Sequence, residues 1–237
     1  MQRYFAKELV DDTFTLSKED TYHIVTVMRL NINDLVEVVY KEEMYISKII
    51  SLCNLIKVQI VNKVVNNYSK RPNITICQSL VKEAKMDLIL QKATELGVSS
   101  IIPIKTTRGL VKLDDKEDKK IKRWQTIVKE ASEQSKRLDI PIITKTKSLK
   151  EIIKGDYTYK ILLSVNETSI NVKKVLSKVL SNDTIIIVIG PEGGFTNEEE
   201  ELLIKGDFIS TSLGDLVLRT ETASISILSM INYIMME

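Results

Sequence analysis

The pattern of apolar residues changes near the end of the first third of the chain, and this change limits the folds open to it. Residues 34–65 alternate apolar and polar side chains over several short runs, which is typical of strands with one buried face. From Asn73 onward, runs rich in Ile and Val alternate with helical segments, which favours an α/β sheet covered on both faces. The sequence therefore predicts two domains, residues 1–69 and 70–237, divided at the polar stretch 66–72 that ends in Pro.

Each domain has an expected set of elements. The first should form a small β-barrel or sheet with one helical stretch at 18–28. The second should begin with a right-handed strand–helix–strand unit whose helix ends before Gly97. Its expected strands are 73–80, 98–105, 142–145, 159–165 and 184–190, and its expected helices are 83–96, 114–138, 171–181, 197–205 and 222–235.

Composition excludes several kinds of chemistry. His23 is the only imidazole, and Cys53 and Cys77 are the only thiols. A zinc site, a serine-type triad and a Cys–His pair therefore lack their parts, so catalysis must use carboxylates, Arg, Lys, hydroxyls or backbone groups, without a metal. No run approaches the ~18 apolar residues of a membrane span, and two unpaired cysteines suit a reducing compartment. We expect a cytoplasmic protein without a membrane partner.

The net charge of +2 hides an uneven distribution. Residues 1–69 carry 8 basic and 9 acidic side chains, residues 70–150 carry 19 and 10, and residues 151–237 carry 7 and 13. The basic middle segment is either a solvated, Lys-rich surface or a face that binds a polyanion. Composition alone leaves both interpretations open.

A glycine-rich segment, Gly190-Pro191-Glu192-Gly193-Gly194, follows the most apolar predicted strand directly. Ligands of open α/β sheets bind where strands end, and glycine lets the backbone approach them closely. The simpler alternative is a tight turn that needs a positive φ. Neither the dinucleotide-binding nor the P-loop signature occurs in the chain. The next helix opens with four consecutive glutamates, which would repel a phosphate, so we expect a ligand without one, such as a cation.

A second unusual segment runs from residue 212 to 223 and contains Arg219 just before the apolar final helix. A cation at the positive end of a helix dipole is unfavourable locally, which makes Arg219 a candidate functional residue. The alternative is a salt bridge to Glu221 or another neighbour.

These segments together resemble a known family. IGPEGGF at 189–195 followed by LGDLVLRTETA at 213–223 resembles the cofactor-binding half of the knotted SPOUT methyltransferases, specifically those that methylate N3 of a uridine in 16S ribosomal RNA. Matching segments occur at 3–5, 23–38, 82–104 and 130–137, so the resemblance covers nearly the whole chain. Three positions depart from the family pattern: Asn33 replaces a usual Gly, Gly109 a Ser, and Lys136 a Gly.

The resemblance implies a PUA-like β-barrel followed by an α/β domain with a deep trefoil knot, assembled as a homodimer. It implies an S-adenosylmethionine pocket made by three loops of the knot. Carried onto this sequence, the cofactor-binding residues are Leu163, Ser164, Val165, Ile189, Gly190, Pro191, Glu192, Gly193, Gly194, Leu213, Gly214, Leu218, Arg219 and Thr220.

The resemblance also suggests roles in methyl transfer. Arg219 could stabilise the developing uracil anion, and Glu192 or Glu221 could accept the N3 proton. The partner would be 16S ribosomal RNA or the small subunit. Residues in matched segments that could contact RNA, each equally well an ordinary surface charge, are Arg3, His23, Arg29, Lys82, Lys85, Arg108 and Arg137.

Two alternatives remain open at this point. The chain could methylate a ribose 2′-hydroxyl with the same fold, or it could be a non-catalytic RNA-binding factor in ribosome assembly.

Overall fold

The computed structural model describes residues 1–65, 70–111, 113 and 116–236. The chain divides into two compact units, one formed by residues 1–69 together with Ser132–Asp139 and the other by Lys70–Ala131 with Ile140–Glu237. The predicted boundary at 66–72 lies partly outside the described residues. That residues 132–139 cluster with the first unit was not predicted from the sequence.

The first unit is built on a six-stranded sheet in the order β1-β4-β5-β6-β3-β2. Strand β1 pairs with β4 in parallel, and the other neighbours are antiparallel. The short strands β1 and β2 are its two edges, so the sheet is open and not the closed barrel that the sequence allowed. Its strands are β1 (Arg3–Phe5), β2 (Leu9–Val10), β3 (Thr13–Thr15), β4 (Leu35–Tyr40), β5 (Glu43–Ser51) and β6 (Lys57–Val64).

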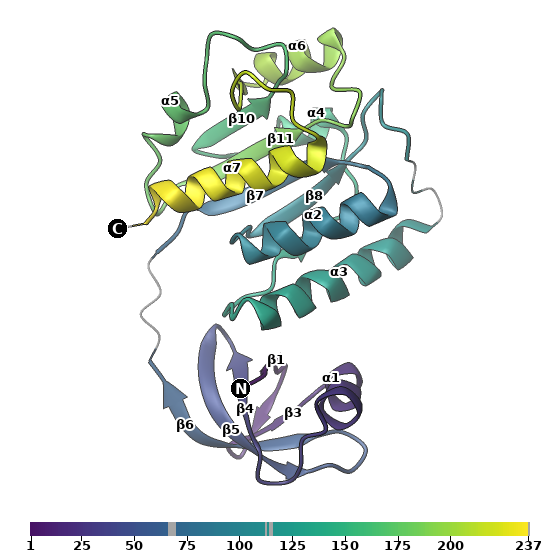
Figure 1. The fold of residues 1–237 in the computed structure, drawn as a ribbon, viewed down its shortest axis with the longest axis vertical. Helices are drawn as coiled ribbons and strands as arrows, with labels where there is room; N and C mark the ends of the chain where they lie inside the picture. The colour runs from purple at the N-terminus through teal and green to yellow at the C-terminus, as the bar shows by residue number, and fades with distance from the viewer. Residues whose placement is uncertain (66–69, 112, 114–115, 237) are drawn as a thin grey trace. The chain divides into compact units, whose positions relative to one another are not determined.

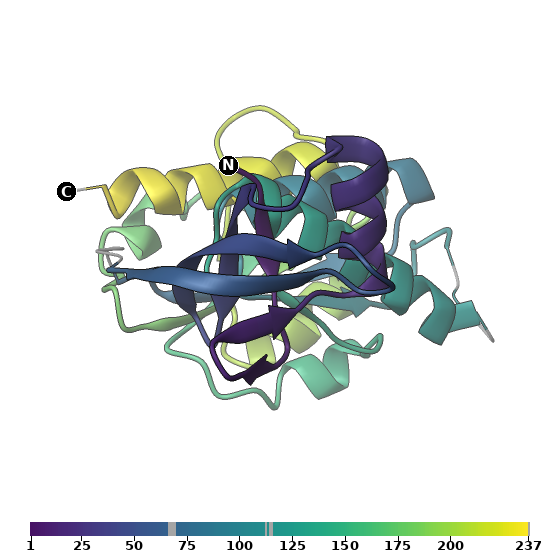
Figure 2. The same cartoon turned by 90° about the horizontal axis from the view of Figure 1, so that it is seen from below.

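The predicted helix at 18–28 consists of two different segments, seen beside the sheet in Figure 2. Helix α1 (Lys18–Tyr22) begins at a capping box in which Ser17 and Asp20 exchange hydrogen bonds. It continues into the π-helix η1 (His23–Met28), which ends at Arg29 with a φ of 53°. Only Ile24 of η1 is buried in the core of this unit.

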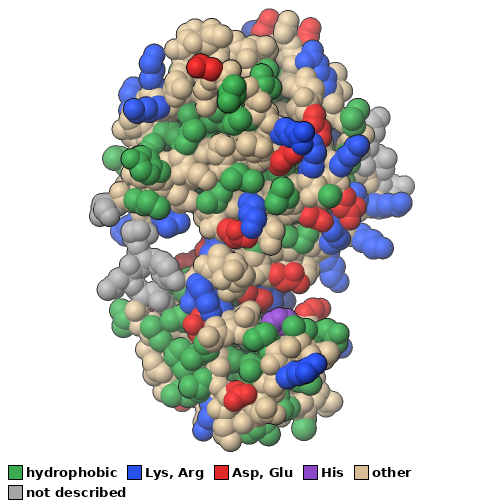
Figure 3. Space-filling view, in the orientation of Figure 1, with side chains coloured by type: hydrophobic (Ala, Val, Ile, Leu, Met, Phe, Trp, Pro, Cys, Tyr) green, Lys and Arg blue, Asp and Glu red, His purple; other side chains and the backbone are tan. Residues whose placement is uncertain are grey.

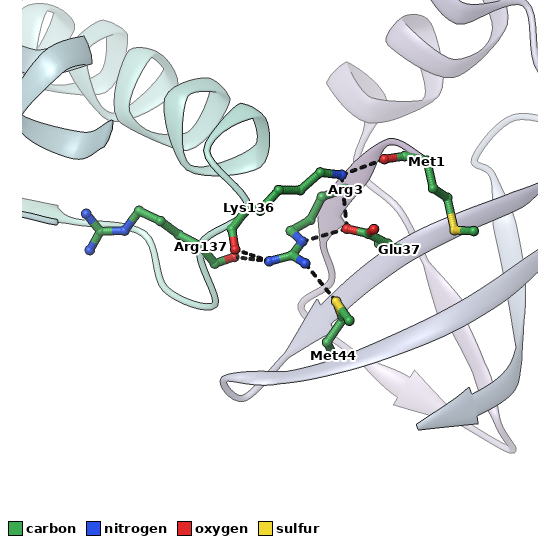
Figure 4. A network of polar contacts seen from close by, with 6 residues as sticks. All are labelled: Met1, Arg3, Glu37, Met44, Lys136 and Arg137. Carbon is green, nitrogen blue, oxygen red and sulfur yellow. Dashed lines mark hydrogen bonds and ion pairs between the residues drawn. The ribbon is translucent and has the colours of Figure 1, made fainter. Parts of the chain in front are cut away.

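A polar cluster joins β1 and β4 to the segment that follows helix α3 (Glu117–Gln134), as Figure 4 shows. The guanidinium of Arg3, only 3% exposed, donates to Glu37, to the backbone oxygens of Lys136 and Arg137, and to the sulfur of Met44. Lys136 also pairs with Glu37, at 3.0 Å. The backbone of Lys136 has a φ of 62°, which explains why glycine would suit this position.

The second unit contains a six-stranded, wholly parallel sheet in the order β12-β10-β11-β7-β8-β9. Strands β7 (Asn73–Ser79) and β8 (Ser100–Ile104) flank α2 (Glu83–Glu95) and form the expected strand–helix–strand unit. The remaining strands are β9 (Ile142–Ile143), β10 (Tyr159–Leu163), β11 (Thr184–Ile189) and β12 (Ile209–Thr211). Strand β11 lies between β10 and β7, so two segments far apart in sequence become neighbours.

Helices cover both faces of this sheet, as the Ile-rich strands predict (Figure 1). One core contains Ile185 and Ile187 of β11 with side chains of α2, α3 (Glu117–Gln134), α5 (Lys173–Leu176) and α7 (Thr220–Ile234). The other contains Ile186 and Val188 with side chains of α4 (Leu149–Ile152) and α6 (Asn197–Lys205). Successive strand residues thus enter opposite cores, which is why these strands read as unbroken apolar runs.

Several element boundaries differ from the predicted ones. The expected helix at 171–181 is reduced to one turn at 173–176, and the expected strand at 142–145 to two residues. Helix α7 begins at Thr220, before the predicted 222. Strand β12 was not predicted, because its three residues IST lack a strong apolar signal. Among the described residues, no helix is long and apolar enough to cross a membrane.

Candidate functional site

Three chain segments meet at the carboxyl ends of β10, β11 and β12 and enclose a pocket of about 400 Å³. This location follows the rule that open parallel sheets bind ligands where their strands end. Every residue that the sequence assigned to the cofactor lines the pocket: Leu163, Ser164, Val165, Ile189, Gly190, Pro191, Glu192, Gly193, Gly194, Leu213, Gly214, Leu218, Arg219 and Thr220.

In the loop after β11, different structural features explain why glycine occurs at positions 190 and 194. Only Gly194 has a positive φ, at 68°, so the tight-turn interpretation accounts for that glycine alone. At Gly190 the packing is tight instead, because a Cβ there would lie 3.1 Å from the ring of buried Phe195, which would have to shift to make room. Its glycines therefore present backbone to the pocket, while Glu192 of the same loop contributes a side chain.

A buried hydrogen-bond network fixes this loop to the start of α7. Thr220 donates its hydroxyl to the Gly190 carbonyl oxygen at 2.7 Å and accepts from the Gln78 side-chain amide at 3.0 Å. Ser224 donates to the side-chain oxygen of Gln78 at 2.7 Å. Gln78, Thr220 and Ser224 are each at most 5% exposed, and such satisfied networks are rigid. The end of β7, the glycine loop and α7 therefore hold a fixed arrangement beside the pocket.

Lys85, on the first turns of α2, lies between the two carboxylates proposed as proton acceptors. Its Nζ is 3.0 Å from Oε1 of Glu192 and 3.5 Å from Oε2 of Glu221. The hydrogen bond from Lys85 lowers the pKa of Glu192, and the same contact raises the pKa of Lys85. Glu192 lines the pocket, whereas Glu221 is 12% exposed and is not one of the lining residues. The structure thus brings together residues that the sequence had assigned to two different roles.

Arg219 is exposed at the N-cap of α7 and lines the pocket. The alternative of a salt bridge to Glu221 is not what the structure contains, because Glu221 pairs with Lys85. Within the described part of the chain, Arg219 has no carboxylate partner. Arg108 is the other arginine of the pocket, and it donates to the backbone oxygens of Gly193 and Phe195 at 2.9 and 3.0 Å.

Glu200 is a pocket residue that sequence reasoning missed. It belongs to the run of four glutamates at the start of α6, and the structure gives its neighbours other tasks. Glu199 completes the capping box with Thr196, and Glu201 pairs with Lys205. Glu200 faces the pocket and accepts from Ser164 Oγ at 2.7 Å and from the Asn166 amide. Its described partners are neutral, so its negative charge is not cancelled by a cation.

The sequence signal for Glu200 was ambiguous because four adjacent glutamates look alike. Only the helical phase of α6 relative to the pocket separates them. Asn166 and Glu167 also line the pocket without having been predicted, and Asp215 lines it from within the predicted loop 213–220.

The residues proposed for RNA contact are dispersed. Arg3 is buried, and its donors are used within the fold, so its side chain is not available to a phosphate. His23 is partly buried, with Nδ1 3.0 Å from the Tyr4 hydroxyl. Arg137 is 11% exposed and pairs with Asp139. Arg29, Lys82 and Arg108 are exposed, and Lys85 joins the carboxylates described above.

Many charges of the basic middle segment have partners. Arg123 pairs with Asp87, Lys92 with Glu95, and Lys145 with Asp118. These ion pairs lower the number of free cations, but their acidic partners belong to the same segment, so its excess of basic over acidic side chains is unchanged.

Comparison with known proteins identifies relatives over the whole length. The family model for an RNA methyltransferase domain matches residues 69–232. Ribosomal RNA small subunit methyltransferase E of Bacillus subtilis is 34% identical, over 98% of this chain and 96% of its own length. The protein of the same name from Mesomycoplasma hyopneumoniae is 31% identical, over 97% of this chain and 98% of its own.

Solved structures share the complete fold. The crystal structure of ribosomal RNA small subunit methyltransferase E from Neisseria gonorrhoeae, bound to S-adenosylmethionine, superposes with a TM-score of 0.87 at 27% identity and covers 98% of this chain and 97% of its own. A Legionella pneumophila protein in complex with the same cofactor superposes with a TM-score of 0.89 at 28% identity, over 98% of this chain and 96% of its own.

Proposed function

The chain belongs to the RNA methyltransferase family, and from this premise we propose that it transfers the methyl group of S-adenosylmethionine to N3 of a specific uridine in 16S ribosomal RNA. The observation that carries the proposal is the pocket at the strand ends, where the glycine loop, a carboxylate and Arg219, which has no carboxylate partner among the described residues, converge. The cofactor is known from the two related crystal structures. The choice of N3 rests on the resemblance to the uracil-N3 methyltransferases, in which the expected barrel domain and segment 130–137 favour a base over a ribose as the target.

The pocket suits a cationic cofactor without phosphates. Its volume lies within the range of ~300–1,000 Å³ common for small-molecule sites. Its lining includes the carboxylates of Glu167, Glu192, Glu200 and Asp215 but only two cations, Arg108 and Arg219. Glu200 in particular has no cationic partner among the described residues, so a positively charged ligand would supply one. The residues that would hold the cofactor are the three loop segments together with Glu200.

The chemistry follows from the placement of Arg219 and the carboxylates. Bound S-adenosylmethionine supplies an electrophilic methyl group on a sulfonium. N3 of uracil gains a bond to this methyl carbon as the carbon–sulfur bond breaks with its electron pair left on sulfur, and the N3 proton passes to Glu192 or Glu221. Arg219 beside O2 or O4 would stabilise the negative charge that develops on the ring. Holding the reacting atoms about 3–3.5 Å apart and in line supplies much of the rate.

The test is methyl transfer by the purified chain to 16S ribosomal RNA and to small subunits, followed by mass mapping of the modified nucleoside. N3-methyluridine at one site is the expected product. A 2′-O-methylated nucleoside would replace the proposal by the ribose methyltransferase alternative. Absence of cofactor binding in calorimetry would favour a non-catalytic assembly factor instead.

We further propose that the first unit is a PUA-like domain and that the second contains the trefoil knot that the resemblance implies. The convergence of 163–165, 189–194 and 213–220 on one pocket supports the second assignment. If the knot is present, single-molecule stretching should give a fully unfolded chain that is shorter than its contour length by the residues trapped in the knot.

A homodimer is also part of the proposal. Large apolar side chains remain exposed around α7 and the loop before it, and green side chains gather on the face that α7 crosses in Figure 3. Their exposed fractions are 80% for Leu216 and Val217, 77% for Tyr233 and 75% for Met236. Large apolar side chains exposed at both ends of one helix favour contact with a partner. Sedimentation of the wild-type chain and of a Tyr233→Glu variant would test it.

RNA binding by exposed cations is proposed for Arg29, Lys82 and Arg108. The affinity for RNA should fall steeply with salt, and charge reversal of Lys82 should weaken binding at all RNA sequences alike. If salt leaves the affinity unchanged, phosphate contacts do not drive binding.

A further inference from the structure

Lys85 was proposed above from sequence as an RNA contact, but its surroundings are unsuited to a phosphate. Two carboxylates lie within 3.5 Å of its Nζ, so the group of three side chains carries a net negative charge. A phosphate approaching Lys85 would be repelled by both. The ammonium is also only partly accessible, at 29% side-chain exposure.

The three side chains come from separate parts of the chain and form an ordered series. Glu221 lies at the start of α7, Lys85 at the start of α2, and Glu192 in the glycine loop. Exposure increases along the series, from 12% for Glu221 to 29% for Lys85 and 38% for Glu192. The innermost member therefore faces the protein and the outermost faces the pocket.

Glu221 is suited to anchoring Lys85 and not to reacting with a substrate. Its Oε2 is buried and has no hydrogen-bond partner among the described residues, leaving Lys85 at 3.5 Å as its compensating charge. A buried carboxylate that depends on one cation holds that cation in place. The network of Gln78, Thr220 and Ser224 fixes the turn of α7 from which Glu221 projects.

We propose that Lys85 is a positioning residue: anchored by Glu221, it holds the Glu192 carboxylate at the pocket, where Glu192 accepts the N3 proton. The inference rests on the proposed methyl transfer and assigns to Glu192 a role that the sequence divided between two glutamates. The arrangement follows a general pattern: a second group orients the reacting group and is itself oriented by a third. Here Glu192 reacts, Lys85 orients it, and Glu221 orients Lys85.

The charged groups around Glu192 set the direction of its titration. Lys85 and Lys82 approach it from the start of α2, Glu221 lies on the far side of Lys85, and Arg108 contacts the backbone of neighbouring Gly193. The hydrogen bond from Lys85 is the main cause of the lowered pKa of Glu192. Removing Lys85 should therefore raise this pKa and shift the acidic limb of the rate profile to higher pH.

The experiment compares Lys85→Met, Lys85→Arg and the control Lys92→Met. Lys92 is also on α2 and also pairs with a carboxylate, Glu95 at 2.8 Å, but lies away from the pocket. Lys85→Met should lower kcat at saturating RNA by about 100-fold, the effect expected when a reacting group is misplaced by about 1 Å. Lys85→Arg should recover part of this loss, and Lys92→Met should match the wild type.

Two readouts separate positioning from RNA contact. Positioning leaves the salt dependence of RNA binding unchanged in Lys85→Met, whereas loss of a phosphate contact reduces the slope of log K against log salt by about 1. A reduced slope with unchanged kcat would overturn the proposal. If Glu221 acts only through Lys85, Glu221→Gln should cost little further activity in the Lys85→Met background. Additive losses of activity would contradict the proposed order Glu221–Lys85–Glu192.

A third readout does not depend on activity. Carbon-13 NMR of the Glu192 carboxyl group in wild type and Lys85→Met measures its titration directly. An upward shift in the variant supports the positioning role even if the methylated atom proves not to be uracil N3. An unchanged titration would overturn the proposal, whereas a wild-type chain without any methyl transfer would refute the proposed function alone.

Discussion

Arg3 of the first unit is 3% exposed and donates to a carboxylate, two backbone oxygens and a sulfur, whereas Arg219 of the second unit is exposed and has no carboxylate partner among the described residues. Both were singled out from sequence as functional. The difference lies in what each unit does with its charges. The first unit uses Arg3 to fix the segment 132–139, while the second leaves Arg219 free beside a pocket. A charge whose hydrogen-bonding capacity is already filled stabilises a fold, and one that is unfilled can act on a ligand.

The largest expected effect follows from removing the free charge. Arg219→Ala should lower kcat by about 100- to 1,000-fold, the loss expected when one donor to a developing anion is removed. The dissociation constant for S-adenosylmethionine should change only a few-fold. The free energy of unfolding should stay within ~1 kcal/mol of wild type, since a cation at a helix N-terminus is unfavourable. Single-turnover kinetics, calorimetry and urea denaturation measure these quantities. Full activity would remove Arg219 from the mechanism.

Removing the buried charge of Arg3 should lower stability and leave catalysis unchanged, the reverse of the result expected for Arg219→Ala. Arg3→Met should lower the free energy of unfolding by about 3 kcal/mol, because it breaks a buried pair and leaves Glu37 with Lys136 alone. Catalysis by the folded fraction should be unchanged. The control Lys63→Met breaks an exposed pair with Glu43 in the same sheet and should cost less than ~1 kcal/mol. Equal losses in the two variants would show that burial of Arg3 contributes nothing.

The same cluster predicts a pH dependence. Burial alone would raise the pKa of Glu37, but hydrogen bonds and charge from Lys136 and Arg3 outweigh it and hold the pKa below its ordinary value of 4.5. A lowered folded-state pKa contributes stability above pH 4.5 that is lost as the pH falls through the folded-state value. Wild type should therefore lose more stability than Arg3→Met between pH 6 and pH 3, on the order of 1 kcal/mol. Urea denaturation across this range measures it, and parallel curves would contradict the prediction.

An effect of similar size, on cofactor binding, is expected from Glu200, which has no cationic partner among the described residues. Glu200→Gln keeps the shape of the side chain but removes its charge, so binding of cationic S-adenosylmethionine should weaken about five- to tenfold, or ~1–1.4 kcal/mol. Binding of the neutral product S-adenosylhomocysteine should weaken less. The neighbouring Glu201→Gln is the matched control, because Glu201 pairs with Lys205 outside the pocket. Calorimetry with both ligands gives the comparison, and equal weakening for the two ligands would mean that Glu200 does not sense the positive charge.

The smallest effect concerns backbone geometry in the first unit. Asn33 has a φ of 77°, where the related family usually has glycine. Asn33→Ala should lower the free energy of unfolding by ~1 kcal/mol, since alanine tolerates this region less well than asparagine. Asn33→Gly should stay within ~0.5 kcal/mol of wild type, because relief of strain and greater freedom of the unfolded chain offset each other. Thermal denaturation distinguishes the two variants, and a stable Asn33→Ala would show that this turn relaxes without strain.

The parallel sheet and most of its helices could be predicted because their signals are local. Ile-rich strands alternate with helices that carry their own start and stop residues, such as the Thr196–Glu199 capping box and Gly97 after α2. Short elements with weak sequence signals were not predicted correctly, because packing against their neighbours decides their structure. The two-residue β9, the three-residue β12 and the single turn of α5 are set by their neighbours and not by propensity.

The same division applies to the site. The sequence by itself determined the chemical inventory: one His, no thiol pair, a glycine loop after an apolar strand, and an arginine before the last helix. Tertiary structure alone decided which charges are free. Arg3 and Arg219 are the same residue type, and four glutamates stand in a row at the start of α6, so nothing local distinguishes a buried anchor from a pocket group. The availability of a charge depends on its solvent exposure and on partners that lie far away in sequence, as Lys85 does between Glu192 and Glu221.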